Sequence, residues 1–347
     1  MKQILAILLL LFSLNSVAQD IHFTQFYESP LNLNPALTGY FPCKYRIGAN
    51  SKNRFVGMGN LYKTRSAWID TKITNVKMRR MWFGLGFKLN HDIEGPGTLK
   101  NTSGTATFSF NNGLNKGNRL FYSLGLGIGY NAHSLNTDGL YYDNQWNGMT
   151  FDTDLPSMEN GITSASNYWD ISGGFLSTYE AMNGQKIYWG MGFHHLNKPT
   201  DSFNGSDNEL AMKTIIHAGF DKYFGSIKLK PRIMYEMKQR QNECTFGLNA
   251  WFSGGNGSFI LGIWSRSGRE ISPLVGIHIK GWLFQLNYDL ITGIPSQATG
   301  MAGGWEFSLV KTFQCTERIA PTGARNKKII PRVWDKKSKT CPAFTSL

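Results

Sequence analysis

Charged side chains recur at every second residue in several stretches, and they are the first candidates for chemistry. The stretch 228–238 shows this spacing in Lys228, Lys230, Arg232, Glu236 and Lys238. Alternate side chains of a strand point to one face, so these residues would share a surface. By the same spacing, other stretches contribute Lys44, Arg46, Lys52, Asp70, Asp221, Asp289 and Glu306. Because both signs occur, the pattern favours internal ion pairs over an anion-selective pore, which would need a ring of one sign.

Patterns typical of enzymes are missing from the sequence. It holds no GxSxG, HExxH or CxxC pattern and no phosphate-binding P-loop. The adjacent pair His194-His195 would point to opposite faces of a strand, which excludes one shared catalytic or metal site. The acids of one long loop lack the spacing of an EF-hand; they are Asp138, Asp143, Asp152 and Asp154. We therefore predict no catalytic activity, no metal site and no cofactor.

The elements that carry the charged residues are predicted to be strands. In 284–290, Phe, Leu and Tyr alternate with Gln, Asn and Asp, and 120–131 alternates in the same way with glycine and serine. Period-two alternation indicates strands whose two faces meet different media. About fourteen segments show it, roughly at 44–54, 62–73, 82–92, 103–111, 119–134, 167–180, 186–196, 212–224, 227–239, 243–253, 258–266, 272–280, 282–292 and 303–313.

The lengths and connections of these segments indicate a transmembrane barrel. Most are near the ~9–11 residues that span a bilayer as tilted strands, and an even number is typical of bacterial outer-membrane barrels. Short connections follow even-numbered segments, at 225–226, 253–257 and 280–281. Several long ones follow odd-numbered segments, at 93–102, 135–166, 197–211 and 293–302. We predict an all-β outer-membrane β-barrel of about 14 antiparallel strands with both termini periplasmic. A soluble β-sandwich, the alternative, does not predict this difference in loop length.

One proline conflicts with this regular pattern. Pro231 has the parity of a lipid-facing residue in the ninth segment, and it cannot donate a hydrogen bond to the neighbouring strand. We therefore predict a bulge or a register slip there. The composition otherwise suits strands and turns, with 38 Gly, 23 Phe, 14 Tyr and 10 Trp and only 17% charged residues.

Both ends of the chain differ in composition from the predicted barrel at 43–314. Lys2, the apolar run 4–12 and Ser16-Val17-Ala18 predict a signal peptide over 1–18. Residues 315–347 hold eight basic and two acidic residues, a net charge of +6 out of +13 for the chain. Outside the cytoplasm, such a tail predicts anionic lipid, glycan or an acidic protein as its partner, and no nucleic acid. A disordered basic spacer is the alternative.

The cysteines bear on how the barrel closes. Cys43 opens the first strand and Cys315 closes the last, and these strands are neighbours in a closed barrel. An oxidising compartment permits disulfides. We predict either a Cys43–Cys315 bond across the seam or a bond from Cys341 to one of them, which would dock the tail. Cys244 is expected to be unpaired.

The segment 19–42, between the signal peptide and the barrel, is rich in aromatic residues and carries Pro30 and Pro35. The prolines exclude regular strand pairing there, whereas the large apolar side chains need burial. We predict that residues 22–41 fold into the barrel and close its periplasmic end, as a plug or as a latch for a partner.

The residues of this segment resemble a known family. Gln25–Tyr27 and the following 29–39 resemble the start of the PorP/SprF family of type IX secretion outer-membrane proteins, with the motif residues Asn32, Asn34, Pro35, Ala36 and Gly39. The stretches 45–48, 54–55, 68–70 and 92–97 also resemble it. The similarity covers about 20–313, and the basic tail departs from the family.

The resemblance implies a non-enzymatic, integral outer-membrane component of type IX secretion. Such a protein supports export or surface retention of cargo, including gliding adhesins. The implied partners are cargo with a type IX C-terminal domain, periplasmic or peptidoglycan-associated secretion components, and outer-membrane lipid. A porin or small-solute outer-membrane transporter is the main alternative, and an outer-membrane hydrolase is a third.

Overall fold

Fourteen antiparallel strands occur in the structure, a computed structural model, where the sequence alternates. The structure describes residues 21–54, 62–74, 80–95, 99–114, 119–136, 142–152, 154–156, 165–181, 184–203, 208–239, 241–255, 257–292 and 303–315. The strands are β1 (Tyr45–Arg54), β2 (Tyr62–Ile73), β3 (Met81–Glu94), β4 (Leu99–Gly113), β5 (Leu120–Ser134), β6 (Ala165–Glu180), β7 (Lys186–His194), β8 (Lys213–Phe224), β9 (Ile227–Lys238), β10 (Gln241–Gly254), β11 (Gly257–Arg266), β12 (Glu270–Ile279), β13 (Trp282–Ile291) and β14 (Gly304–Phe313). Their predicted number is confirmed. The stretch 93–102 was expected as a loop but is mostly strand, because β3 and β4 are longer than their alternating cores.

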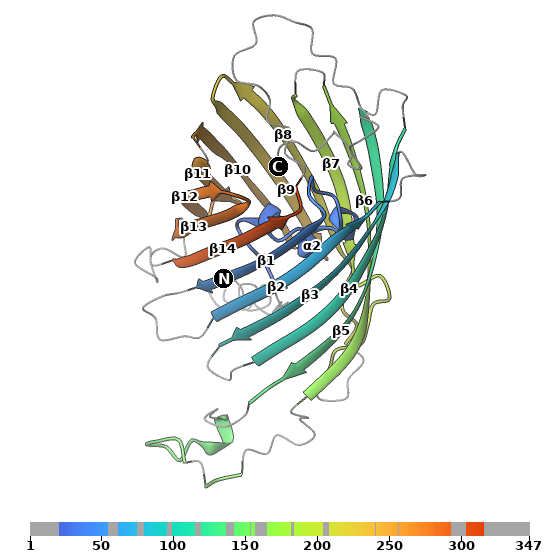
Figure 1. The fold of residues 1–347 in the computed structure, drawn as a ribbon. Coiled ribbons are helices and arrows are strands. Elements are labelled where there is room, and N and C mark those ends of the chain that lie inside the picture. Colours follow the sequence, from blue (N-terminus) through green and yellow to red (C-terminus); the bar gives the residue numbers. More distant parts are fainter. Residues whose placement is uncertain are drawn as a thin grey trace, which may run out of the picture.

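The strands close into a barrel in which each pairs with its neighbours in sequence (Figure 1). The ring is completed by β1 and β14, which pair from Tyr45↔Phe313 to Asn53↔Trp305. We call the end at which odd-numbered strands finish the long-loop end. The other end, where β1 begins and β14 finishes, is the short-turn end.

The two faces of the wall differ in polarity. On β4, Thr107, Ser109 and Asn111 face inward and are at most 3% exposed, whereas the intervening Phe108 is 43% exposed. Large apolar residues elsewhere on the outer face are also exposed, such as Leu126 at 61%. An apolar outer face around a polar interior is the pattern of a transmembrane β-barrel.

Pro231 produces neither the bulge nor the register slip predicted from the sequence. The β8–β9 register is the same on both sides of it, with Gly219↔Arg232 and Lys222↔Leu229. The proline cannot donate to the carbonyl of Phe220 on β8. Arg232 Nη1 donates to that carbonyl instead, at 3.0 Å. A side chain thus replaces the missing backbone donor, and the strand stays regular.

Residues 21–42, which we call the plug, lie inside the barrel as a chain of short helical turns (Figure 1). These are η1 (Phe26–Glu28), α2 (Pro30–Leu33) and η2 (Pro35–Leu37), and a further turn, η3 (Asp143–Gln145), lies between β5 and β6. Within the described ranges, no helix has the length and apolar character needed to cross a membrane. The predicted signal peptide (1–18) and residues 316–347 of the basic tail lie outside the described residues.

Candidate functional site

The plug folds locally because its prolines begin helical turns. Pro30 starts α2 and Pro35 starts η2, positions where the missing N–H group of proline costs no hydrogen bond. Asn34 separates the two turns in an extended conformation, and its side-chain oxygen accepts from the N–H of Ala36 at 2.9 Å. The same residues that exclude a strand therefore produce a compact segment that fits inside the barrel.

The asparagines of the predicted motif anchor the plug to two separate parts of the wall. Asn32 Nδ2 donates to Ser66 Oγ on β2 at 2.9 Å and to Asn90 Oδ1 on β3 at 3.2 Å. Asn34 Nδ2 donates to the Phe175 carbonyl on β6 at 2.9 Å. It also lies 3.0 Å from Nε2 of His217 on β8. The motif residues thus bind the wall of the chain's own barrel.

The backbone of the rest of the motif is also held by wall side chains. Ser123 Oγ on β5 donates to the carbonyl of Ala36 at 2.7 Å, and Ser109 Oγ on β4 donates to that of Thr38 at 2.5 Å. The N–H of Gly39 donates to Asp70 Oδ2 at 2.8 Å. These bonds satisfy plug groups that an interior position would otherwise leave unpaired.

Glycines on the inner face let the plug approach the wall. A Cβ atom on Gly125 of β5 would overlap the backbone of Pro35 and lie 2.6 Å from the Cα of Ala36. One on Gly192 of β7 would lie 2.6 Å from the carbonyl oxygen of Leu33. At these positions any side chain would displace the plug.

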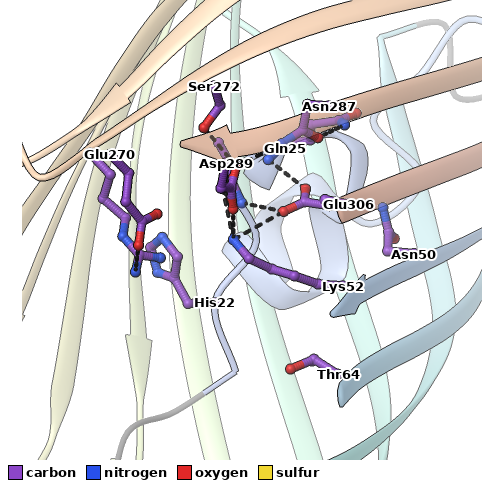
Figure 2. Close-up of polar contacts among 12 residues, drawn as sticks. His22, Gln25, Asn50, Lys52, Thr64, Glu270, Ser272, Asn287, Asp289 and Glu306 are labelled. Atoms are coloured by element: carbon purple, nitrogen blue, oxygen red, sulfur yellow. Dashed lines mark hydrogen bonds and ion pairs between the residues drawn. The ribbon is translucent and has the colours of Figure 1, made fainter. Parts of the chain in front are cut away.

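Two buried charge clusters join the plug to strands β1, β2, β13 and β14. In the first, Arg46 binds Asp70 through Nε at 3.0 Å and Nη2 at 2.8 Å. In the second, the ammonium of Lys52 lies 2.8 Å from Asp289 and 3.2 Å from Glu306 (Figure 2). All three residues of the second cluster are at most 3% exposed.

The plug completes the second cluster. Glu306 accepts from the N–H groups of Thr24 at 2.8 Å and Gln25 at 2.7 Å. Asp289 accepts from Ser272 Oγ at 2.6 Å and from Thr24 Oγ1 at 3.1 Å. Two carboxylates share one ammonium here, so the two N–H groups and the Thr24 hydroxyl of the plug, together with Ser272 of the wall, supply further donors that buried charges need.

The plug runs through the lumen from one end to the other. Near its C-terminal end, the carbonyl of Gly39 accepts from Trp82 Nε1 at 3.1 Å, where β3 begins at the short-turn end. Near its N-terminal end, His22 lies 3.7 Å from Glu236 and 3.2 Å from Glu243 at the long-loop end. The first and last described residues therefore lie toward opposite ends of the barrel. The sequence argument counted strands and did not count this extra passage; the two termini themselves lie outside the described residues.

Aromatic residues fill the space between the plug and β10–β11. Tyr27 stacks on Trp264 at 4.9 Å between ring centres, and Phe26 meets the same ring edge-on at 5.6 Å. The amide of Asn249 donates to the Tyr27 hydroxyl at 2.8 Å, and its oxygen accepts from Trp264 Nε1 at 2.9 Å. The predicted burial of these aromatic residues thus occurs inside the lumen.

Three of the five charged residues of β9, Lys228, Arg232 and Glu236, form ion pairs inside the barrel. Asp221 of β8 binds Lys228 at 3.0 Å and Arg232 at 2.6 Å. Lys230 lies over the Trp251 ring at 3.6 Å. Glu236 lies between Lys213, at 3.8 Å, and the plug residue His22, and Lys238 is buried.

Lys44 departs from the predicted lumen set. It precedes β1 at the short-turn rim and is exposed, with its Nζ 5.0 Å from the centre of the Tyr45 ring. Parity fixes the face of a residue only inside a strand, and Lys44 lies just outside one.

The cysteines lie at the barrel seam. Cys43 and Cys315 form a disulfide at the short-turn end, across the β1–β14 junction. Among the cysteines that the structure describes, Cys244 is free. Cys341, the alternative partner predicted for one of these two cysteines at the seam, lies outside the described residues.

The sequence argument assumed that both adjacent histidines lie on a strand, but only one of them does. His194 ends β7, and His195 turns away with a φ of 58°, where its Nδ1 lies 3.0 Å from Asp170. Nearby, His133 lies 2.8 Å from Asp201. Burial alone would raise the pKa of Asp201, but the hydrogen bond and charge of His133 hold it below its usual value. No group of three metal-ligating side chains occurs among the described residues.

The sequence did not identify the residues of the barrel wall that contact the plug. They include Asn249, Trp264 and the inward glycines at 125 and 192. Their signal is weak, because glycine on an inward parity position is equally consistent with an empty lumen. Only the alternation of glycine with large apolar residues along 120–131 indicated a face on which side chains are excluded.

Comparison with known proteins gives a family match over most of the chain. The family model described as type IX secretion system membrane protein PorP/SprF matches residues 15–310. No curated protein sequence matches significantly.

Similar solved structures are β-barrels of low sequence identity. A deletion mutant of the monoaromatic hydrocarbon channel TodX is 9% identical, with a TM-score of 0.49 and coverage of 82% of this chain and 94% of that one. A Pseudomonas aeruginosa FadL homologue is 9% identical, with a TM-score of 0.44 and coverage of 81% and 92%. The translocator domain of the autotransporter NalP from Neisseria meningitidis is 9% identical, with a TM-score of 0.41 and coverage of 84% and 96%. At these scores, none carries a functional argument.

Proposed function

Because the chain belongs to the PorP/SprF family of type IX secretion system membrane proteins, we propose that it supports export or surface retention of cargo proteins, gliding adhesins among them. At the level of the family, it is an outer-membrane component of that secretion system. We assign it no catalytic role. Its proposed partners are cargo with a type IX C-terminal domain and periplasmic or peptidoglycan-associated secretion components.

The occupied lumen is the observation that carries this proposal against the porin alternative. Hydrogen bonds join the plug to strands all around the barrel, namely β1 to β6, β8, β10, β13 and β14. A porin keeps a water-filled channel through its lumen. The plug donates hydrogen bonds to buried charges of the wall. We therefore expect it to stay seated and to keep the lumen closed.

The same contacts distinguish between the two roles predicted for this segment, which are a plug and a latch for a partner. Asn34, Pro35 and Ala36 are buried against the wall, so a partner has no access to them while the plug is seated. We therefore propose that the motif anchors the plug, and that cargo and secretion components bind outside the lumen.

The proposal is tested by deleting the gene in cells that carry it and measuring surface cargo. We expect cargo to be lost from the cell surface and restored by the wild-type gene. We also expect the purified wild-type barrel to pass little current in planar bilayers. Ion-selective conduction by the wild-type protein, together with unchanged surface cargo in the deletion, would instead establish the porin alternative.

A further inference from the structure

Three lysines gather on the outer side of the barrel seam at the short-turn end. Lys44 precedes β1, Lys280 lies in the turn between β12 and β13, and Lys311 lies on β14. Strand pairing brings them together, because Trp282 pairs with Lys311 and Tyr45 pairs with Phe313. We call this group the seam cluster; its members are Lys44, Tyr45, Lys280, Trp282, Lys311 and Phe313.

Two lysines of the seam cluster, Lys44 and Lys311, lie over aromatic rings. Lys311 Nζ is 4.8 Å from the centre of the Trp282 ring and 5.6 Å from that of Phe313. It also donates to the carbonyl of Lys280 at 2.8 Å. The Trp282 and Phe313 rings are 37% and 39% exposed on the outer face. Cations over aromatic rings at a strand end mark the depth of the lipid headgroups.

No acid in the described part of the chain forms an ion pair with these three lysines. Asp221, which lies toward the same end, faces the lumen and binds Lys228 and Arg232. Within the described residues, the seam cluster therefore presents three positive charges without an acidic partner toward the bilayer surface. This contrasts with the lumen, where Lys52 lies between two carboxylates.

An apolar surface extends from the seam cluster toward the middle of the bilayer. Ile277, Ile279 and Phe284 on β12 and β13 are exposed on the outer face at 49%, 46% and 42%. Phe284 pairs with Ile277, and Ile279 pairs with Trp282, so this surface is continuous with the cluster. Positive charge above an apolar strip matches a phosphate group above an acyl chain.

We propose that the seam cluster binds the headgroup phosphate of an anionic glycerophospholipid in the leaflet at the short-turn end. Lys44 and Lys311 lie against aromatic rings of the strand ends, which favours a lipid over an acidic protein as the occupant. Phosphatidylglycerol is the probe for this site, and phosphatidylcholine is its zwitterionic control. Binding at the seam would hold the β1–β14 junction, next to the Cys43–Cys315 disulfide, in the membrane interface.

The test measures lipid binding by the purified full-length barrel, for example by native mass spectrometry during titration. The seam variant is the triple Lys44→Gln, Lys280→Gln, Lys311→Gln. A matched control removes the same charge at exposed residues of the long-loop end, as the triple Lys100→Gln, Lys198→Gln, Arg269→Gln. Each lysine near an anionic surface contributes about fivefold to binding. We therefore expect the seam variant to bind phosphatidylglycerol at least about tenfold more weakly, and the control to bind as the wild type does.

A second variant, Trp282→Leu, keeps all three charges and removes the nearer of the two rings under Lys311. We expect it to lose part of the phosphatidylglycerol preference, which loss of charge alone does not predict. The proposal is overturned if the wild type binds both lipids equally, or if seam and control variants lose the same affinity. It is also overturned if the wild type shows no lipid preference but retains an acidic periplasmic protein that the seam variant loses.

Discussion

A single methyl group on the inner wall should unseat the plug. Gly125 of β5 faces the lumen, and a Cβ atom there would overlap the backbone of Pro35 and lie 2.6 Å from the Cα of Ala36. In Gly125→Ala the plug backbone must therefore retreat by about 1 Å to reach van der Waals separation. Gly104→Ala on β4 is the matched control, because its nearest neighbour would be a Leu89 side-chain atom at 3.4 Å.

The cost of this retreat follows from the contacts at Ala36. Overpacking at a buried site costs about 1–3 kcal/mol. The hydrogen bonds from Ser123 to the Ala36 carbonyl and from the Ala36 N–H to Asn34 would be lost or lengthened. Each contributes about 1 kcal/mol, so the total is about 3–5 kcal/mol. That energy raises the displaced population of the plug by at least about a hundredfold relative to the control.

The assay is ion conduction by purified protein in planar bilayers. Barrels of eight strands are filled by side chains, whereas those of 16–18 strands enclose a channel, so a barrel of fourteen strands should conduct once its plug moves. We expect Gly125→Ala to open far more often than the wild type, and Gly104→Ala to behave as the wild type. Equal, low conductance in all three proteins would refute the reasoning that these glycines seat the plug.

Other perturbations test the remaining contacts. Lys52→Met leaves two buried carboxylates without their ammonium, and should lower thermal stability in detergent by about 3–5 kcal/mol; an unchanged melting temperature would contradict the role of that cluster. Cys43→Ala should cost on the order of 2–5 kcal/mol, because the disulfide closes a long loop, whereas Cys244→Ala should melt as the wild type does. In a Cys244→Ser background, we expect an impermeant maleimide to label Ile21→Cys from outside intact cells. Lys280→Cys should be labelled only after the outer membrane is opened; the reverse pattern would contradict the predicted orientation, in which the short-turn end faces the periplasm.

The strands of the barrel wall could be predicted from the sequence because the alternation that indicates each strand is a local pattern. Alternation along 120–131 and 284–290 reports directly on which medium each face meets, and the strand follows from it. Strand ends are predicted less well, since β3 continues to Glu94 and β4 begins at Leu99, both beyond their alternating cores. Parity also misplaced Lys44, which lies one residue before its strand.

The plug contacts could not be read from the sequence because they are formed over long separations. Lys52 meets carboxylates at positions 289 and 306, and no local pattern marks Asp289 and Glu306 as its partners. The prolines predicted that residues 22–41 leave the sheet, but not that they cross the whole lumen. That passage depends on the width of the closed barrel and on glycines such as Gly125, whose role is visible only against Ala36.

Affinity purification of the tagged full-length protein from solubilised outer membranes, followed by mass spectrometry, tests the central claim most directly. A non-enzymatic type IX component with a closed lumen should retain a secreted protein that bears a type IX C-terminal domain. The same purification from a strain that lacks the cargo serves as the control. Recovery of the barrel without any such cargo, under conditions that preserve other membrane complexes, would contradict the account.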